Sequence, residues 1–385
     1  MQDFIKISKY AGMRNDLAQA GGGNTSVKLD DHIMLVKSSG CQLADVSERY
    51  GYSKVDYRKI ADYFEKYVRF SGKGRDSLTD KDNVTNPYAE DFSQADKSIF
   101  TEEAGKSLLA EAQIEGGRAS IETFLHAITG KYTLHSHPML VNILTAREGG
   151  MDVLRTLFPR AVFVPYRKPG AALAETYFNI YLEQQAQGAD GTVIFLANHG
   201  LVVSGNDGDT VIEQTEQVLD KIAEYLGIDD SACREATKLY RTIQQIDVLT
   251  GYIVYLSENR YLTQEYAGHG LVENNTWEHA FCPDCVVYAN KKLLYLPERY
   301  EVGDILDFTG KYGIPTLIYR KGHFYILAES VRKAQEIENV MSFAARVQYE
   351  NRGETMRYLS GGQQDELLNW DAEKYRRLFS GVSTK

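Results

Sequence analysis

The sequence contains few cysteines and no long apolar run. Four cysteines in a chain of 385 residues are too few for a disulfide scaffold, so we expect reduced thiols. No apolar run approaches the roughly 18 to 20 residues that a membrane-spanning helix needs. The N-terminal residues also lack the basic-then-apolar pattern of a signal peptide. We therefore expect a cytoplasmic protein without a membrane partner.

Positive charge is also scarce. The chain has 43 Lys and Arg against 53 Asp and Glu, a formal net charge of -10, whereas binding to a nucleic acid backbone needs a basic face. No Gly-x-Gly-x-x-Gly follows a predicted strand, so a nicotinamide site is not supported. With 43% hydrophobic and 25% charged residues, the composition is that of a soluble globular protein with one large or two moderate domains.

Three short motifs lack the partner residues that would make them functional. Cys282 and Cys285 form a single Cys-x-x-Cys, and because a closed zinc site needs four ligands we interpret them as a structural pair rather than a zinc or redox site. Residues 359–364 spell the signature of ABC-type ATPases, and 105–107 read Gly-Lys-Ser. Phe100, however, stands where the phosphate loop requires its first glycine. We treat both as chance matches.

The most informative stretch is 120–138, whose pattern predicts a short helix, a turn and a strand. Ser120 is expected to cap the helix, with Glu122 in its first turn. In the strand that follows, His135 and His137 are two residues apart, so their imidazoles point to the same face. We interpret this pair as two ligands of one metal ion, although a lone His-x-His is more often structural.

A third ligand is expected from 193–203, where an apolar run typical of a buried strand breaks at Asn198-His199-Gly200 and then resumes. Three neutral imidazoles around a divalent ion leave coordination positions open, which is the pattern of a catalytic rather than a structural site. We therefore predict that His199 completes the site and that a substrate can bind the metal directly.

Two loops of small residues precede the central stretch. The first runs from 20 to 26 (Ala-Gly-Gly-Gly-Asn-Thr-Ser) and the second from 37 to 40 (Lys-Ser-Ser-Gly). The segments between them, 27–29 and 32–36, alternate like a hairpin. Because backbone amides in glycine-rich loops can approach an anion closely, the two loops together suggest a phosphate cradle. Either loop alone is more often only a turn.

The rest of the pattern indicates two consecutive α/β units, 1–256 and 257–385. Residues 70–100 are charged and poor in apolar groups, so we expect a surface excursion there. His323, in the second unit, is interpreted as an ordinary strand or turn residue. Further helices are expected at 4–19, 140–147, 174–187, 209–226, 232–255 and 330–350. A strand is expected at 161–164, and short apolar elements at 286–288, 293–296, 316–319 and 324–327.

Six motifs, spread over 10–226, belong together: Gly23-Asn24-Thr25-Ser26, Ser39-Gly40, Ser120-Ile121-Glu122, His135-Ser136-His137, Pro165-Tyr166 and Asn198-His199-Gly200. In this order they resemble the class II aldolase/adducin family, whose members include fuculose-phosphate and rhamnulose-phosphate aldolases. The part that follows is similar to the matching portion of longer bacterial aldolase modules that are often fused to a short-chain dehydrogenase. The resemblance implies an α/β/α sandwich with a central, mostly antiparallel sheet, followed by a smaller α/β unit.

The resemblance also implies roles for single residues. Tyr166 matches a tyrosine that reaches a neighbouring subunit's site as proton donor, which implies a homo-oligomer with active sites near subunit interfaces. Two departures concern the phosphate pocket: Ile121 replaces a serine, and a longer segment separates Ser39 from Ser120. The resemblance implies zinc on His135, His137 and His199, and Mn2+ or Co2+ are also compatible with imidazole ligands. It implies Glu122 as the general base. The implied substrate contacts are Gly23, Asn24, Ser39, Gly40 and Ser120.

The leading hypothesis is a zinc-dependent aldolase that cleaves or forms a ketose 1-phosphate through a dihydroxyacetone phosphate enediolate, giving an aldehyde. A metal that chelates the carbonyl and hydroxyl oxygens stabilises the enediolate charge. A carboxylate beside it moves the carbon-bound proton, and a tyrosine can protonate the leaving oxygen. A sugar-phosphate epimerase or dehydratase on the same scaffold, and a metal-free adducin-like binding module, stay open as alternatives.

Overall fold

The computed structural model describes residues 1–68, 100–272, 278–289 and 292–369. The expected excursion over 70–100 lies outside these ranges except for its last residue. The chain divides into two compact units, Met1–Asp230 and Ser231–Lys385. This division comes before the boundary expected at 256/257, because α10 (Ser231–Ile243) and β9 (Ile253–Leu256) pack together in the second unit. Among the described helices, none is both long and apolar enough to cross a bilayer.

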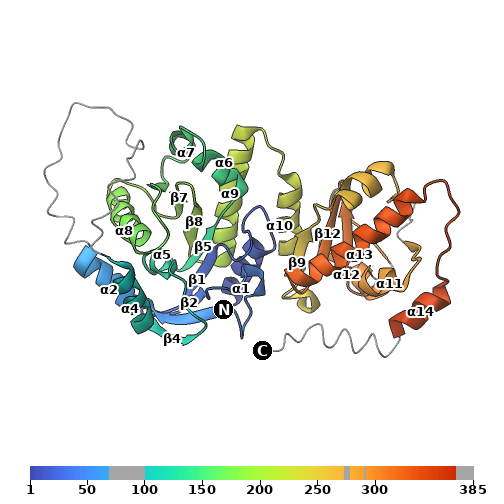
Figure 1. Cartoon of the computed structure of the whole chain (residues 1–385), viewed down its shortest axis with the longest axis horizontal. Coiled ribbons are helices and arrows are strands. Elements are labelled where there is room, and N and C mark those ends of the chain that lie inside the picture. Colours follow the sequence, from blue (N-terminus) through green and yellow to red (C-terminus); the bar gives the residue numbers. More distant parts are fainter. Residues whose placement is uncertain (69–99, 273–277, 290–291, 370–385) are drawn as a thin grey trace. The chain divides into compact units, whose positions relative to one another are not determined.

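The first unit is built on an eight-stranded sheet with the order β4-β3-β2-β1-β5-β8-β7-β6 (Figure 1). Neighbouring strands are antiparallel except β6 and β7, which are parallel. The expected hairpin is formed by β1 and β2. The strands are β1 (Asn24–Lys28), β2 (Ile33–Lys37), β3 (Tyr52–Asp56), β4 (Gln113–Gly116), β5 (Tyr132–Ser136), β6 (Val162–Val164), β7 (Val193–Leu196) and β8 (Gly200–Gly205).

Helices cover both faces of this sheet. On one face, α1 (Gln2–Gly12) packs through Phe4 on Val27 of β1, with α9 (Gly208–Leu226) alongside it. On the other face, α8 (Ala171–Ala186) packs through Tyr177 on Val202 of β8, and α5 (Thr123–Ile128) lies next to α8. Side chains alternate between the faces of a strand, so these two helix pairs lie on opposite sides. The α/β/α arrangement expected from the sequence is confirmed.

The first helix is shorter than the predicted 4–19 and ends at Gly12. A Cβ atom at Gly12 would lie 2.1 Å from the backbone nitrogen of Ala44, so this end of the helix is pressed against the loop after β2. Beyond it the chain turns, with the backbone N–H groups of Leu17 and Ala18 donating to the carbonyl of Arg14. The segment that follows Gly12 therefore runs to the edge of the central strands instead of continuing the helix.

The remaining helices of the first unit connect the strands. The predicted helices at 140–147, 174–187 and 209–226 correspond to α6, α8 and α9, and the predicted strand at 161–164 corresponds to β6. Short elements not expected from the sequence flank the N-terminal strands. The connecting elements are η1 (Leu43–Asp45), α2 (Tyr57–Tyr63), η2 (Phe64–Val68), α4 (Glu102–Ala112), α6 (Met139–Thr145) and α7 (Gly150–Leu157).

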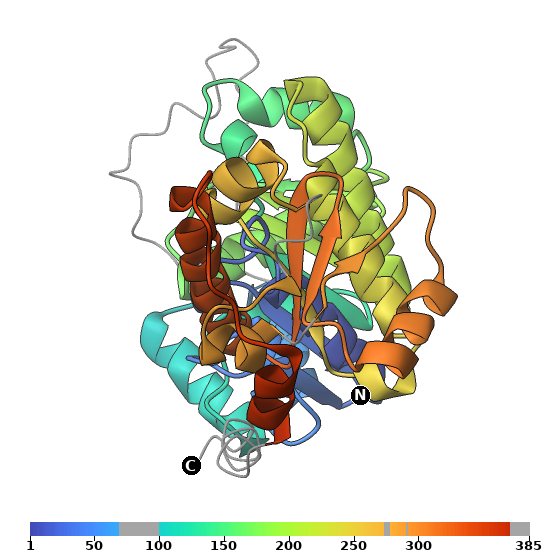
Figure 2. The same cartoon turned by 90° about the vertical axis from the view of Figure 1, so that its right-hand side faces the viewer.

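The second unit has a four-stranded sheet with the order β10-β11-β12-β9, in which only β10 and β11 are parallel. The long helix α13 packs beside β12, as the orange strands and red helix in Figure 2 show. Its elements are α10, η5 (Asp247–Leu249), β9, η6 (Tyr261–Tyr266), η7 (Ala267–His269), α11 (Pro283–Ala289), β10 (Leu294–Tyr295), α12 (Val302–Tyr312), β11 (Leu317–Arg320), β12 (His323–Ala328), α13 (Val331–Glu350) and α14 (Gly361–Asn369).

One prediction for this unit was wrong in part. The helix expected over 232–255 ends at Ile243, and 253–256 form β9, because these residues pair with β12 at the edge of the second sheet. The short apolar element at 286–288 lies within helix α11. There Val286 packs in a cluster with Ala344 of α13. A short apolar run fits a strand or a helix equally well, so tertiary packing decides.

Candidate metal centre

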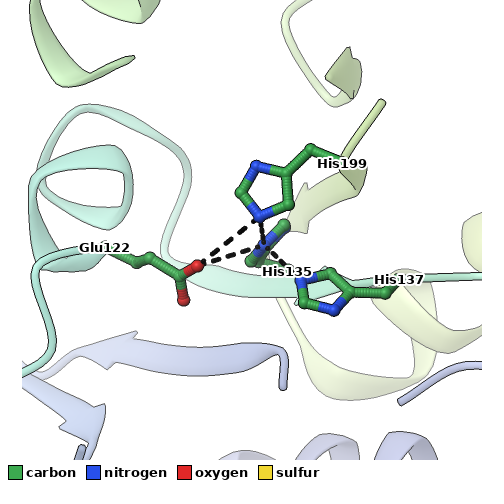
Figure 3. Close-up of side chains that lie close together, drawn as sticks. All are labelled: Glu122, His135, His137 and His199. Atoms are coloured by element: carbon green, nitrogen blue, oxygen red, sulfur yellow. Dashed lines mark hydrogen bonds and ion pairs between the residues drawn. The ribbon is translucent and has the colours of Figure 1, made fainter. Parts of the chain in front are cut away.

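The central strand β5 carries the first two histidines. His135 lies opposite Asn24 of β1 and Val202 of β8, so it is paired on both sides and fully buried. His137 follows one residue beyond the end of the strand, and its ring lies beside that of His135, with the two rings converging (Figure 3). The His-x-His spacing therefore brings two imidazoles to one face, as predicted.

The third histidine sits in the tight connection between β7 and β8. Asn198 has φ of 50°, a left-handed conformation that asparagine tolerates better than most residues. At Gly200, an added Cβ would lie 2.2 Å from the carbonyl oxygen of Ser136, so only glycine lets β8 approach the end of β5 this closely. Asn142 of α6 donates to the carbonyl of His199 at 3.2 Å. The Asn-His-Gly sequence is thus a local requirement for placing His199 beside β5.

Glu122 immediately precedes α5, which begins at Thr123. The expectation of a Ser120 cap with Glu122 in the first turn is corrected: Glu122 itself is the capping residue by position, and its side chain makes no capping bond. Ser120 still organises the turn, because its Oγ accepts from the backbone N–H of Glu122 at 3.3 Å. The carboxylate of Glu122 is therefore not used to cap the helix, and it points toward the histidines (Figure 3).

These four side chains converge, with one ligand atom of each within 4.8 Å of the others. His135 Nε2 lies 3.2 Å from His137 Nε2 and 3.3 Å from His199 Nε2. The Oε1 atom of Glu122 lies 3.5 Å from His135 Nε2 and 3.7 Å from His199 Nε2. Ligand nitrogens around a tetrahedral zinc ion, at bond lengths of about 2.0–2.1 Å, are separated by roughly 3.3 Å.

The protonation of the cluster also suits a cation. The Nδ1–H of His135 donates to the carbonyl of Leu201 at 3.1 Å, which leaves the Nε2 lone pair aimed at the other histidines. Burial and the neighbouring His135 lower the pKa of His137 to about 3 and that of His199 to about 4, so both rings are neutral near pH 7. Neutral imidazole is the form that binds a metal.

The carboxyl group of Glu122 is ionised in this setting. Burial by itself raises its pKa, but the electrostatic interaction with His135 and the weaker one with His199 outweigh burial and hold the pKa of Glu122 well below its usual range. Three nitrogen donors and one carboxylate oxygen are the donor set of a divalent metal site, and among the described residues this is where such a set forms.

The first glycine loop packs directly against the histidine strand. An added Cβ at Gly22 would lie 2.8 Å from His137 Nδ1, and one at Gly23 would lie 2.9 Å from the carbonyl oxygen of His135. Asn24, expected to contact substrate, is 1% exposed, and its Nδ2 donor has no hydrogen-bond partner among the described residues. A buried donor without a partner at this position is consistent with a polar ligand there.

Lys37, the first residue of the second loop, to which the sequence analysis gave no role of its own, lies under the first glycine loop. It is 3% exposed, and its Nζ donates to the carbonyls of Gly21 (2.8 Å) and Gly23 (3.1 Å). Burial lowers the pKa of Lys37, and the charge of Glu122 acts in the opposite direction. The only sequence signal was a lysine at the end of an apolar strand, which is compatible with many surface positions.

The second loop meets the segment that carries Ser120, despite the long intervening sequence. The backbone N–H of Ser39 donates to the carbonyl of Arg118 at 2.8 Å, and Ser38 forms a bridge with Ala119. Ser39 and Gly40 are exposed. The long segment between Ser39 and Ser120 therefore leaves the two ends adjacent, and their roles as substrate contacts stay a prediction.

Tyr166 lies after β6 and is 44% exposed. In the described part of the chain, no hydrogen bond joins its hydroxyl to the four-residue cluster. Its role as a proton donor stays a prediction.

The motifs interpreted as non-functional lie away from this cluster in the sequence. Cys282 and Cys285 are both free thiols, with their Sγ atoms 3.3 Å apart, and Gly105-Lys106-Ser107 lies inside helix α4.

The chain is similar to several known proteins. Residues 2–226 match the family model described as "Class II Aldolase and Adducin N-terminal domain". The "Uncharacterized oxidoreductase YuxG" of Bacillus subtilis (strain 168) is 23% identical over 381 residues, which are 90% of this chain and 49% of that protein. The chain thus spans about half the length of this curated relative.

Two solved structures illustrate the structural likeness. The N-terminal class II aldolase domain of a conserved protein from Thermoplasma acidophilum is 22% identical, with a TM-score of 0.44, covering 58% of this chain and 92% of that one. The L-fuculose-1-phosphate aldolase from Thermus thermophilus is 15% identical, with a TM-score of 0.33, covering 58% of this chain and 92% of that one.

Proposed function

Because the chain belongs to the class II aldolase and adducin N-terminal domain family, we propose that it is a zinc-dependent aldolase that cleaves or forms a ketose 1-phosphate. The observation that carries the proposal is the convergence of three histidine Nε2 atoms with a carboxylate 3.5 Å from the central one. A bound divalent cation would act as the electron sink for charge that develops on the substrate oxygens.

Glu122 is the proposed general base. Its carboxylate is ionised in the free protein, which is the form that accepts a proton, and it stands next to the three imidazoles rather than in solvent. In aldol chemistry this group would take and return the proton at the nucleophilic carbon of dihydroxyacetone phosphate.

The glycine loop is the proposed site for the anionic end of the substrate. The unpartnered Nδ2 of Asn24 and the backbone of Gly23 lie beside His135, and Lys37 adds a buried positive charge beneath the same loop. Ser39, Gly40 and Ser120 complete the proposed contacts. The phosphate group of the substrate would thus meet hydrogen-bond donors and the Lys37 ammonium group, while the sugar part of the substrate meets the histidines.

Tyr166 is the proposed acid for the leaving oxygen, acting in the site of an adjacent protomer. Its exposure of 44% fits a side chain that becomes covered only in an assembly. The proposal therefore includes a homo-oligomer with active sites near subunit interfaces, and a small sugar phosphate as the partner molecule.

The test is a substrate screen combined with metal analysis. Purified protein is expected to contain close to one divalent ion per chain after zinc supplementation, and to release dihydroxyacetone phosphate from one member of a ketose 1-phosphate panel. His199→Ala is expected to lose both metal and activity, while His323→Ala, in the second unit, keeps both. Full lyase activity in chelated, metal-free protein would refute the proposal, and a single isomeric product instead of two fragments would favour the epimerase.

A further inference from the structure

We propose that a buried ion cluster between α1 and α9 positions the metal-binding His137. The cluster, called here the Arg14 cluster, consists of Tyr10, Arg14, Asp16 and Glu216. Arg14 contacts Asp16 through two nitrogens, at 2.9 Å (Nε) and 2.5 Å (Nη2), and contacts Glu216 through Nη1 at 2.5 Å. The hydroxyl of Tyr10 donates to the same oxygen of Glu216 at 2.5 Å. The guanidinium therefore bridges the turn after α1 to helix α9.

This cluster is placed where ionic groups are costly. The side chain of Arg14 is 2% exposed, and those of Asp16 and Glu216 are 14% and 16% exposed. Taking such charges out of water costs several kcal/mol per ion, and well-packed apolar residues often give equal or better stability. Stability alone is thus a weak explanation for the cluster, whereas the fixed fork of an arginine defines the relative position of the groups it joins.

The turn that the cluster fixes is bonded to the metal ligand strand. The backbone N–H of His137 donates to the carbonyl of Leu17 at 2.7 Å, and that of Met139 donates to the carbonyl of Asp16 at 2.8 Å. Leu17 in turn donates its N–H to the carbonyl of Arg14 at 3.0 Å. Asp16 thus belongs to both systems: its carboxylate holds Arg14, and its carbonyl holds the residue two places beyond His137.

His137 needs such a support because it lies outside the sheet. The last paired residue of β5 is Ser136, which lies opposite Leu201, so His137 has no strand neighbour within the described part of the chain. Its backbone N–H is satisfied by Leu17 and its ring is flanked by Gly22, both from the segment after Arg14. His135, by contrast, is held by strands on both sides. The Arg14 cluster does for His137 what strand pairing does for His135, and Arg14 is a positioning residue.

The inference rests on metal binding at the histidine cluster, not on the aldol reaction. Asp16→Asn and Glu216→Gln keep the shape of the side chains and remove one charge each. The matched control is Asp209→Asn, which breaks the Lys6 to Asp209 ion pair (2.6 Å); this pair joins the same two helices and lies outside the turn that contacts His137. Arg14→Lys keeps the charge and removes the fork, so it is expected to rescue binding only in part.

The experiment measures Co2+ binding and amide exchange on the folded full-length variants. Asp16→Asn and Glu216→Gln are expected to weaken Co2+ binding by about 10- to 100-fold, as loss of outer support does at other metal sites, and to alter the visible Co2+ spectrum. Hydrogen exchange in the peptide 132–138 of the metal-free protein is expected to rise in both, and to stay unchanged in Asp209→Asn.

The outcomes separate the two proposals. Equal Co2+ affinity and equal exchange in Asp16→Asn, Glu216→Gln and Asp209→Asn would overturn the role of the Arg14 cluster. If one of the variants does not fold, the other and Arg14→Lys carry the test. A wild-type protein that binds Co2+ but cleaves no ketose phosphate would refute the proposed activity and leave this inference standing. A wild-type protein that binds no Co2+ would refute both.

Discussion

Acidification is expected to destabilise the metal-free protein in a pH window set by its buried imidazoles. Burial lowers the pKa of His126 and His137 to about 3 and that of His199 to about 4, and His135 adds to each shift. The unfolded chain binds protons at these positions near the ordinary histidine pKa of about 6.5. Below that pH the unfolded state holds more protons than the native state, so stability falls as the pH falls.

The size of the effect follows from the same shifts. At pH 5.5, the three groups together lower the free energy of unfolding by about 4 kcal/mol relative to pH 7.5. That is a large part of the roughly 5–15 kcal/mol available to a folded protein. Glu122 contributes little in this window, because its pKa is lowered and its contribution is lost only below the ordinary carboxyl range.

The assay is urea unfolding of chelator-treated protein at pH 7.5 and pH 5.5, followed by circular dichroism. His126→Asn removes one of the three groups, so its pH-dependent loss is expected to be about one third smaller. His32→Asn, whose side chain is 67% exposed, is the matched control and should behave like the wild type. Equal unfolding free energies of the wild type at the two pH values would refute the argument that these imidazoles are held neutral.

Three further predictions concern the proposed active site. Glu122→Gln should retain zinc and substrate affinity but lose about 10²- to 10⁴-fold in kcat, the usual range for a general base; loss of zinc, measured by elemental analysis, would instead make Glu122 a ligand. Gly200→Ala should weaken zinc binding and lower the melting temperature, because its Cβ would lie 2.2 Å from the carbonyl oxygen of Ser136; unchanged binding and melting would contradict the close approach of β8 to β5. Tyr166→Phe should lower kcat with little change in KM, and mixing it with Glu122→Gln subunits should restore partial activity if the tyrosine serves a neighbouring protomer; no recovery in re-formed oligomers would argue against a shared site.

Much of the metal centre could be predicted from sequence because its determinants are local. The two-residue repeat of a strand fixes His135 and His137 on one face whatever surrounds them. The Asn-His-Gly turn is also local, since asparagine and glycine are the residues that its backbone requires. The convergence of His199 with this pair needed the strand order, and the ordered motifs of the family supplied it.

The parts that sequence did not reveal depend on contacts between distant segments. Helix α1 ends at Gly12 because the loop after β2 packs against it, a contact that periodicity cannot show. The strand at 253–256 owes its form to pairing with β12, some seventy residues later. Arg14 and Glu216 gave no sequence signal, and Lys37 gave only its place between an apolar strand and the second loop, because a buried charge is recognised only through the partners that surround it.

The strand order has a consequence for how the centre comes into being. Donor groups leave the ribosome in the order Glu122, His135, His137 and His199, and the carbonyl that orients His135 belongs to Leu201, later still. A nascent chain that lacks the β7–β8 connection holds at most two of the three imidazoles. The segment around Leu17, whose carbonyl accepts from the backbone N–H of His137, is synthesised long before His137 and packs against it only after β5 has formed. The three imidazoles therefore come together only after β8 has paired with β5, so a metal ion can bind all three only in the folded first unit. A bound metal would indicate that this unit has folded.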